Sequence, residues 1–118
     1  MTHPSGAYFI VYVADMDRAT KFYEETFEAM ISFRSPEWTS LRIAGVDIGL
    51  HGGADTAARK IGLGFDVDDI DGACAAVVSA GGAVVKPPEH KPEEGGITLA
   101  EVADTEGNLF SLSLANAH

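Results

Sequence analysis

The sequence contains one strand–helix unit twice, and this repeat constrains the fold more than any other feature. The segment "VADMDRATKFY" at residues 13–23 is followed 54 residues later by "VDDIDGACAAV" at residues 67–77. A short apolar run of the kind found in buried strands precedes each copy, at 7–14 and 60–67. Asp15 and Asp69 can each cap a helix by accepting the free N–H groups of its first turn. We therefore predict helices near 15–27 and 69–80.

Three strand-like runs follow each predicted helix, at about 28–34, 37–44 and 46–51 and again at about 83–86, 97–103 and 108–114. The run "GVDIGL" at 45–50 corresponds to "GNLFSL" at 107–112, with a spacing of 62. The second copy is longer within 86–96, where three prolines and two glycines predict a loop. The chain is thus expected to be a single α+β domain over 1–118. It would contain two βαβββ modules, at about 7–51 and 60–114, whose strands form a cupped mixed sheet.

Composition narrows the possible partners and the compartment. The net charge is −10, from 18 acidic and 8 basic residues, which disfavours nucleic acid and membrane surfaces and would suit a cationic ligand. No apolar run approaches the ~20 residues that span a bilayer, and no signal-peptide pattern opens the sequence. The single cysteine, Cys74, lies in an apolar setting and is expected to be buried. These features predict a cytoplasmic protein.

Two segments carry a family resemblance. The segment "VADMDRATKFYEETF" resembles the first strand–helix junction of the vicinal oxygen chelate superfamily, and "DTEGNLFSL" resembles its closing turn and last strand. That superfamily includes glyoxalase I, extradiol dioxygenases, and fosfomycin and bleomycin resistance proteins. The resemblance extends from residue 8 to residue 114 and implies a cup built from two modules, in which metal-dependent members bind the ion. It indicates the fold much more strongly than the substrate.

The same resemblance implies where metal ligands would lie. The family register places the four ligand positions at Tyr8, Gly49, Gly62 and Ser111. Divalent metals in such sites need carboxylate or imidazole donors, which two glycines, a tyrosine and a serine do not supply. We therefore predict no metal and no cofactor at these positions.

Alternation along the predicted strands indicates which residues face the cup. Aromatic rings beside glycines would leave a slot for a small planar, aromatic or cationic molecule. Trp38 fits a pocket wall and ordinary packing about equally well. The predicted ligand-binding residues are Tyr8, Tyr12, Trp38, Arg42, Asp47, Gly49, His51, Gly62, Asp66 and Ser111.

Three functions are compatible with this pattern. The loss of the metal ligands favours a metal-independent protein that sequesters a small molecule, similar to the bleomycin and other antibiotic resistance members of the family. The alternative is a lyase, isomerase or oxygenase with a non-standard site, in which His51 and Asp47, on one strand face, would be catalytic. A structural or regulatory module with an unused cup is the third. A homodimer is expected in each case, with modules paired within one chain or exchanged between chains.

Overall fold

The computed structural model describes residues 2–114, and its elements follow the predicted order. Module one comprises β1 (Phe9–Tyr12), α1 (Met16–Phe27), β2 (Met30–Arg34), β3 (Trp38–Ile43) and β4 (Val46–His51). Module two comprises β5 (Arg59–Val67), α2 (Ile70–Ser79), β6 (Ala83–Lys91), β7 (Ile97–Ala103) and β8 (Asn108–Leu114), with a short 3-10 helix at Pro92–Glu94. The α+β fold of two βαβββ modules is therefore confirmed.

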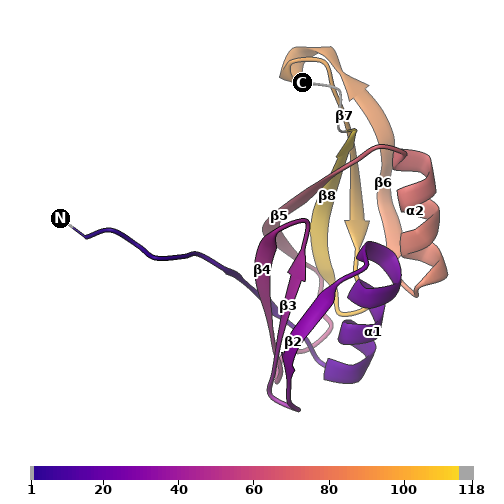
Figure 1. Ribbon diagram of the computed structural model, residues 1–118. Coiled ribbons are helices and arrows are strands. Elements are labelled where there is room, and N and C mark those ends of the chain that lie inside the picture. The colour runs from indigo at the N-terminus through magenta and orange to yellow at the C-terminus, as the bar shows by residue number, and fades with distance from the viewer. Residues whose placement is uncertain (1, 115–118) are drawn as a thin grey trace.

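Each module forms its own four-stranded mixed sheet. The strand orders are β1-β4-β3-β2 and β5-β8-β7-β6, so that β1 and β5 are edge strands of their sheets. Both of these strands run parallel to their neighbours, β4 and β8, whereas the remaining pairs are antiparallel. Figure 1 shows α1 and α2 on the same side of the two sheets, and the segment before β1 extending away from the body. Within residues 2–114, no helix covers the opposite faces.

The strand register confirms the internal repeat residue by residue. Ile10 pairs with Gly49 in module one, and Gly64 pairs with Ser111 in module two. These positions differ by 54 on the first strand and by 62 on the last, as the sequence spacing predicts. The helices begin at the predicted caps as well, because Asp15 accepts from the Arg18 N–H and Asp69 from the Gly72 N–H.

The segment predicted as a loop at 86–96 is mostly strand, and that part of the prediction was wrong. Strand β6 continues to Lys91, and only the residues after it turn back toward β7. Pro87 and Pro88 are tolerated because β6 is an edge strand and its register shifts between Lys86 and Glu89. A proline lacks the N–H that a central strand would have to donate, but an edge strand has one side without a partner. The result is a long hairpin that projects at the top of Figure 1.

One hydrophobic core joins the two modules. The alternate residues predicted to pack under the helices are buried, among them Ile48, Leu50, Phe110 and Leu112. Phe27 of α1 crosses to the other module, where its ring centroid lies 4.7 Å from that of Phe65 and 5.9 Å from that of Phe110. Burying such rings is worth about 1.5–3 kcal/mol each, so the modules are held together by packing as well as by the chain.

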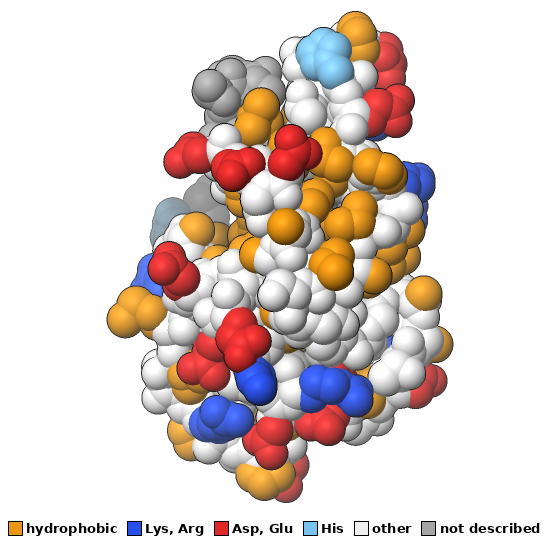
Figure 2. Space-filling model, turned by 90° about the vertical axis from the view of Figure 1, so that its right-hand side faces the viewer, with side chains coloured by type: hydrophobic (Ala, Val, Ile, Leu, Met, Phe, Trp, Pro, Cys, Tyr) orange, Lys and Arg blue, Asp and Glu red, His pale blue; other side chains and the backbone are white. Residues whose placement is uncertain are grey.

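Charged and hydrophobic side chains are unevenly distributed over the helix-covered side of the molecule, which Figure 2 shows. Charged side chains of both signs gather low on this side, where α1 lies, and hydrophobic side chains gather higher, where α2 lies. Val78 and Val85 are exposed despite their apolar side chains. Within residues 2–114 no helix is both long enough and apolar enough to cross a membrane.

Candidate functional site

Two hollows lie on the sheet faces that the helices leave uncovered, one in each module. The first, of about 520 Å³, is lined by residues between Ser5 and Gly49. The second, of about 320 Å³, is lined by residues between Lys60 and Ser111. Each hollow is thus built by one module alone. The structure does not bring the module-one candidates and the module-two candidates together in a single pocket.

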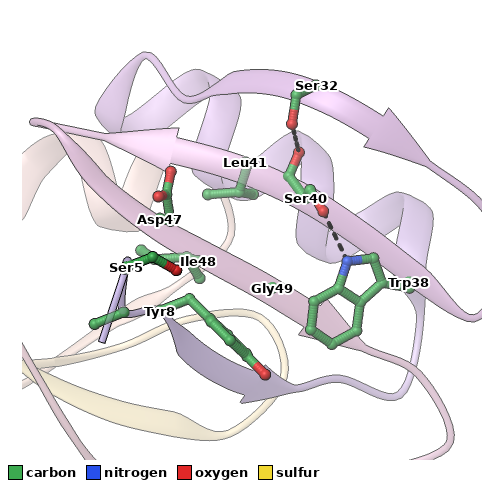
Figure 3. Close-up of a pocket in the computed structure, with 11 residues that line it drawn as sticks. Ser5, Tyr8, Ser32, Trp38, Ser40, Leu41, Asp47, Ile48 and Gly49 are labelled. Carbon is green, nitrogen blue, oxygen red and sulfur yellow. Dashed lines mark hydrogen bonds between the residues drawn. The ribbon is translucent and has the colours of Figure 1, made fainter. Parts of the chain in front are cut away.

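The module-one hollow is organised by Trp38 and Gly49. The Trp38 indole N–H donates a 2.8 Å hydrogen bond to the Ser40 hydroxyl, which fixes the ring along the sheet surface (Figure 3). A Cβ added to Gly49 would lie 2.0 Å from Cζ2 of Trp38. The prediction of an open slot over Gly49 is therefore wrong, because the indole fills it. Figure 3 shows the Tyr8 ring extending toward the indole, so that the two rings border the remaining space.

A row of three rings crosses the end of this sheet. Tyr12, His51 and Trp38 are register partners on β1, β4 and β3. The His51 ring centroid lies 5.4 Å from that of Tyr12 and 6.2 Å from that of Trp38. His51 Nδ1 is 2.7 Å from the carbonyl oxygen of Gly52, and since a carbonyl only accepts, Nδ1 carries the hydrogen. In the neutral imidazole, the other ring nitrogen, Nε2, is then the hydrogen-bond acceptor.

The proposed partnership of His51 with Asp47 is not formed. The two residues are four positions apart on β4, which corresponds to about 13 Å along a strand, with Gly49 between them. Asp47 instead lies 3.7 Å from Arg42, which also donates to the Gly45 carbonyl. Arg42 therefore belongs to the β3–β4 hairpin end, whereas Asp47 also lines the module-one hollow with Tyr8 and Trp38.

The module-two hollow has a different character. Of its predicted residues, Ser111 lines the hollow, whereas Gly62 and Asp66 lie on the exposed surface of β5. A Cβ at Gly62 would meet nothing within 4 Å, so this position leaves open space. Five charged residues that were not predicted from the sequence line the hollow as well: Lys60, Lys86, Glu89, Lys91 and Glu101. Glu101 could have been predicted from strand alternation along β7, where it pairs with Ser111. Lys86 was missed because the segment that contains it was predicted to be a loop.

The family's metal site does not fit the residues present. Tyr8 and Gly49 belong to one hollow and Ser111 to the other, and none of the four positions carries a carboxylate or imidazole. Within residues 2–114, no three His, Cys, Asp or Glu side chains are grouped as metal ligands would be. The chemistry available to the two hollows therefore comes from rings, hydroxyls, ammonium groups and carboxylates that are not grouped as metal ligands.

An ion pair with a buried carboxylate lies away from both hollows, where the turn before β8 meets the start of α1. The Glu106 carboxylate is fully buried and accepts hydrogen bonds from both backbone N–H groups of Ala14 and Asp15. It also receives two hydrogen bonds from the Arg18 guanidinium, at 2.7 and 3.0 Å, and one from the Thr105 hydroxyl. Burial alone would raise the pKa of Glu106, but these hydrogen bonds outweigh it and hold the pKa at about 2.

The rest of the same turn is bonded to module one too. Asp104 accepts from the Tyr23 hydroxyl at 2.6 Å, and burial together with this carboxylate raises the pKa of Tyr23. Asn108 donates to the Tyr12 carbonyl, and so does Arg59. We call Arg18, Tyr23, Arg59, Asp104, Glu106 and Asn108 the inter-module cluster. It positions the β1–α1 junction, and with it the ring row, against module two.

The fold agrees with a comparison of the sequence against protein families. The family described as the glyoxalase/bleomycin resistance protein/dioxygenase superfamily matches residues 6–112. The chain therefore belongs to this superfamily, as the resemblance indicated. No curated protein sequence matches the chain.

Several solved structures share the fold. A bleomycin resistance determinant encoded on transposon Tn5 is 22% identical, with a TM-score of 0.73, over 96% of this chain and 99% of that one. The fosfomycin resistance protein FosX from Listeria monocytogenes, solved with Mn(II) and sulfate, is 21% identical, with a TM-score of 0.76, over 97% and 93%. A family enzyme from Burkholderia phytofirmans PsJN is 20% identical, with a TM-score of 0.75, over 91% and 96%. At these identities the likeness establishes the fold alone.

Proposed function

We propose that this protein binds a planar, aromatic small molecule without chemically changing it and without a metal. The observation that carries this proposal is the module-one hollow, in which Tyr8 and Trp38 border a space of about 520 Å³. Bleomycin resistance among the structural relatives is compatible with sequestration of an antibiotic as the biological role. The single, buried cysteine supports a cytoplasmic location as part of the same proposal.

Ring stacking supplies the affinity in this proposal. The Trp38 indole is held by the Ser40 hydroxyl and by Gly49 beneath it, so it loses little freedom when a ligand stacks on it. The Tyr8 ring is 66% exposed, which leaves most of its apolar surface for a ligand to cover. An aromatic pair is worth about 0.5–1.5 kcal/mol beyond the buried area, so two rings can support micromolar binding of a small flat molecule once area is included.

We further propose that a second copy of the chain completes the site. Strand β1 has apolar side chains on both faces, yet Phe9 is 45% and Ile10 is 39% exposed. A strand that is apolar on both faces is normally buried on both. Its open edge, and the open edge of β5, are available to a partner copy, which would place the two hollows of different chains in one cup. Size-exclusion chromatography with light scattering would show a dimer, and Ile10→Lys would convert it to a monomer.

The geometry of His51 favours an enzyme as the second candidate. Its Nε2 is presented as a hydrogen-bond acceptor at the edge of the ring row, which suits a general base. This candidate requires turnover of a small carbonyl or related substrate that His51→Gln abolishes. A loss of turnover without a loss of binding would identify catalysis.

Fluorescence of Trp38, the only tryptophan, tests the binding proposal directly. Titration with a panel of aromatic antibiotics should give saturable quenching by at least one compound. Tyr8→Ala should weaken the binding of that compound by about tenfold and leaves the Trp38 fluorophore in place. Phe33→Ala is the matched control, because Phe33 is an aromatic of β2 that is 57% exposed and does not line the hollow.

The outcome separates the candidate functions. Saturable quenching that depends on Tyr8 and not on Phe33 supports sequestration. If no compound quenches the fluorescence and the protein shows turnover that depends on His51, the enzyme candidate is supported instead. Absence of both would leave a structural or regulatory module with an unused cup.

A further inference from the structure

The module-two hollow concentrates positive charge in an acidic protein. Three of the eight basic residues of the chain, Lys60, Lys86 and Lys91, line it. Only two carboxylates, Glu89 and Glu101, line it with them, so its charged lining sums to about +1 where the whole chain carries −10. The field of the whole molecule thus favours cations, whereas this hollow does not.

The strand register places four residues in one row across this sheet. Gly64 on β5 pairs with Ser111 on β8, Ser111 with Glu101 on β7, and Glu101 with Lys86 on β6. Register partners point to the same face, and this is the face away from α2. The row therefore presents an open backbone, a hydroxyl, a carboxylate and an ammonium group side by side. Lys60 reaches the row from β5, with its Nζ 3.8 Å from the Glu101 carboxylate.

The donors of this hollow are not all used. Lys91 is neutralised by two carboxylates, at 3.7 Å from Glu89 and 3.9 Å from Glu94. Lys60 shares Glu101 at a distance too long for a hydrogen bond. Within residues 2–114, neither the Lys86 ammonium nor the Ser111 hydroxyl has a hydrogen-bond or ion-pair partner. The ammonium groups of Lys60 and Lys86 and the hydroxyl of Ser111 are therefore available to donate hydrogen bonds to a ligand in this hollow.

We propose that Lys60, Lys86 and Ser111 bind the anionic group of the ligand, a carboxylate or a phosphonate. This inference rests on the proposed function, because it treats the two hollows as parts of one cup: the rings bind the planar part and the lysines bind the charged part. Ammonium and hydroxyl donors match the oxygens of such anions, and charge-assisted hydrogen bonds are about twice as strong as neutral ones. The ligand class is then an aromatic anion instead of the aromatic cation that the net charge suggested.

Three simple probes separate this inference from the function on which it rests. Methylphosphonate carries the anion alone, phenol the ring alone, and phenylphosphonate both. At low ionic strength, methylphosphonate should shift the Ser111 and Gly64 amide signals in NMR spectra, and phenol should shift the single indole N–H signal of Trp38. Phenylphosphonate should shift both sets and bind at least tenfold more tightly than either fragment. If phenol shifts the indole signal but methylphosphonate leaves Ser111 unchanged, the anion site is wrong and the binding function survives. If methylphosphonate binds at Ser111 while no aromatic compound affects Trp38, the proposed function fails and the anion site stands on its own.

Charge variants give a second, independent test. Lys86→Gln should weaken methylphosphonate binding about three- to tenfold, whereas Glu101→Gln should strengthen it about threefold, because it removes a repelling carboxylate. Lys21→Gln is the matched control, since it changes the net charge by the same amount on the exposed surface of α1. All three side chains are at the surface or partly exposed, so folding should be preserved. If Lys21→Gln and Lys86→Gln weaken methylphosphonate binding equally, the anion is attracted by the overall charge and not by a specific site, and the proposal is wrong.

Discussion

Nε of Arg18 donates a 2.7 Å hydrogen bond to the buried carboxylate of Glu106, although the two residues are 88 positions apart and belong to different modules. Removing the charge by Glu106→Gln should lower the free energy of unfolding by about 2–4 kcal/mol. The carboxylate has two acceptor oxygens, whereas the glutamine amide has one oxygen that accepts and an NH2 group that donates. The amide therefore cannot accept all the hydrogen bonds from the guanidinium, the Thr105 hydroxyl and the two backbone N–H groups. Urea unfolding monitored by circular dichroism would measure the change.

Glu25→Gln is the control for that variant. Glu25 lies 3.9 Å from Lys21 on the exposed surface of α1, where an ion pair is worth about 0.5 kcal/mol or less. Equal destabilisation by Glu25→Gln and Glu106→Gln would contradict the role assigned to the inter-module cluster.

The low pKa of Glu106 predicts that the free energy of unfolding decreases at acidic pH. A carboxylate whose pKa falls to about 2 on folding, from 4.5, stabilises the folded state fully above pH 4.5. This contribution is lost progressively as the pH falls from 4.5 toward 2. The difference in unfolding free energy between wild type and Glu106→Gln should therefore narrow across that window. A difference that stays constant from pH 6 to pH 2.5 would show that the charge of Glu106 is not what stabilises the fold.

The contact between Trp38 and Gly49 predicts a steric coupling. Gly49→Ala should destabilise the protein by about 1–3 kcal/mol and shift the tryptophan emission to longer wavelength, because the new methyl group displaces the indole toward water. Gly62→Ala, on β5 of module two, meets open space and should be nearly neutral. In a Trp38→Ala background the cost of Gly49→Ala should largely disappear. If it persists undiminished, the strand itself and not the indole requires glycine at 49.

Gly107 is predicted to be irreplaceable for two reasons. Its φ of +87° is unfavourable for any residue with a Cβ, and that Cβ would lie 2.4 Å from the Thr56 carbonyl oxygen in the linker between β4 and β5. Gly107→Ala should cost about 2 kcal/mol or more in thermal or urea unfolding. Gly45→Asn serves as the control, because Gly45 has a similar φ of +80° but nothing within 4 Å of its Cβ position. A tolerated Gly107→Ala would mean that the linker can move away from the turn.

The donor set at the family ligand positions predicts a protein without a stoichiometric divalent metal. Elemental analysis after mild purification should find far less than one equivalent of zinc, iron, manganese or nickel per chain. Near one equivalent, lost on Tyr8→Phe or Ser111→Ala, would show that the register assigned to these positions is wrong.

Most of the fold could be predicted because its causes are local. Asp15 and Asp69 cap their helices through side chains that reach only three residues along the chain, and strand alternation depends on neighbours two residues apart. The one element that was mispredicted, β6, depends on its position at the sheet edge. Pro87 and Pro88 argue against a strand until it is known that one side of β6 has no partner.

The site was less predictable, since it depends on contacts between segments far apart. Alternation placed Gly49 and Trp38 on one face, but only the packed structure shows that the indole lies across the glycine and occupies its space. His51 and Asp47 share a face as well, yet their separation along β4 and the pairing of Asp47 with Arg42 keep them apart.

The sequence by itself determined the two βαβββ modules, their helix starts and the residues of the core, because periodicity and capping act within a few residues. The tertiary structure alone decided which polar groups meet. Glu106 lies in the turn before β8, and nothing near it in the chain marks it as a buried charge. It becomes one because folding brings the turn against the β1–α1 junction, where two backbone N–H groups and the Arg18 guanidinium donate to its carboxylate. Long-range hydrogen bonding of this kind leaves no periodic signal in the sequence, since the partners are fixed by packing and not by spacing.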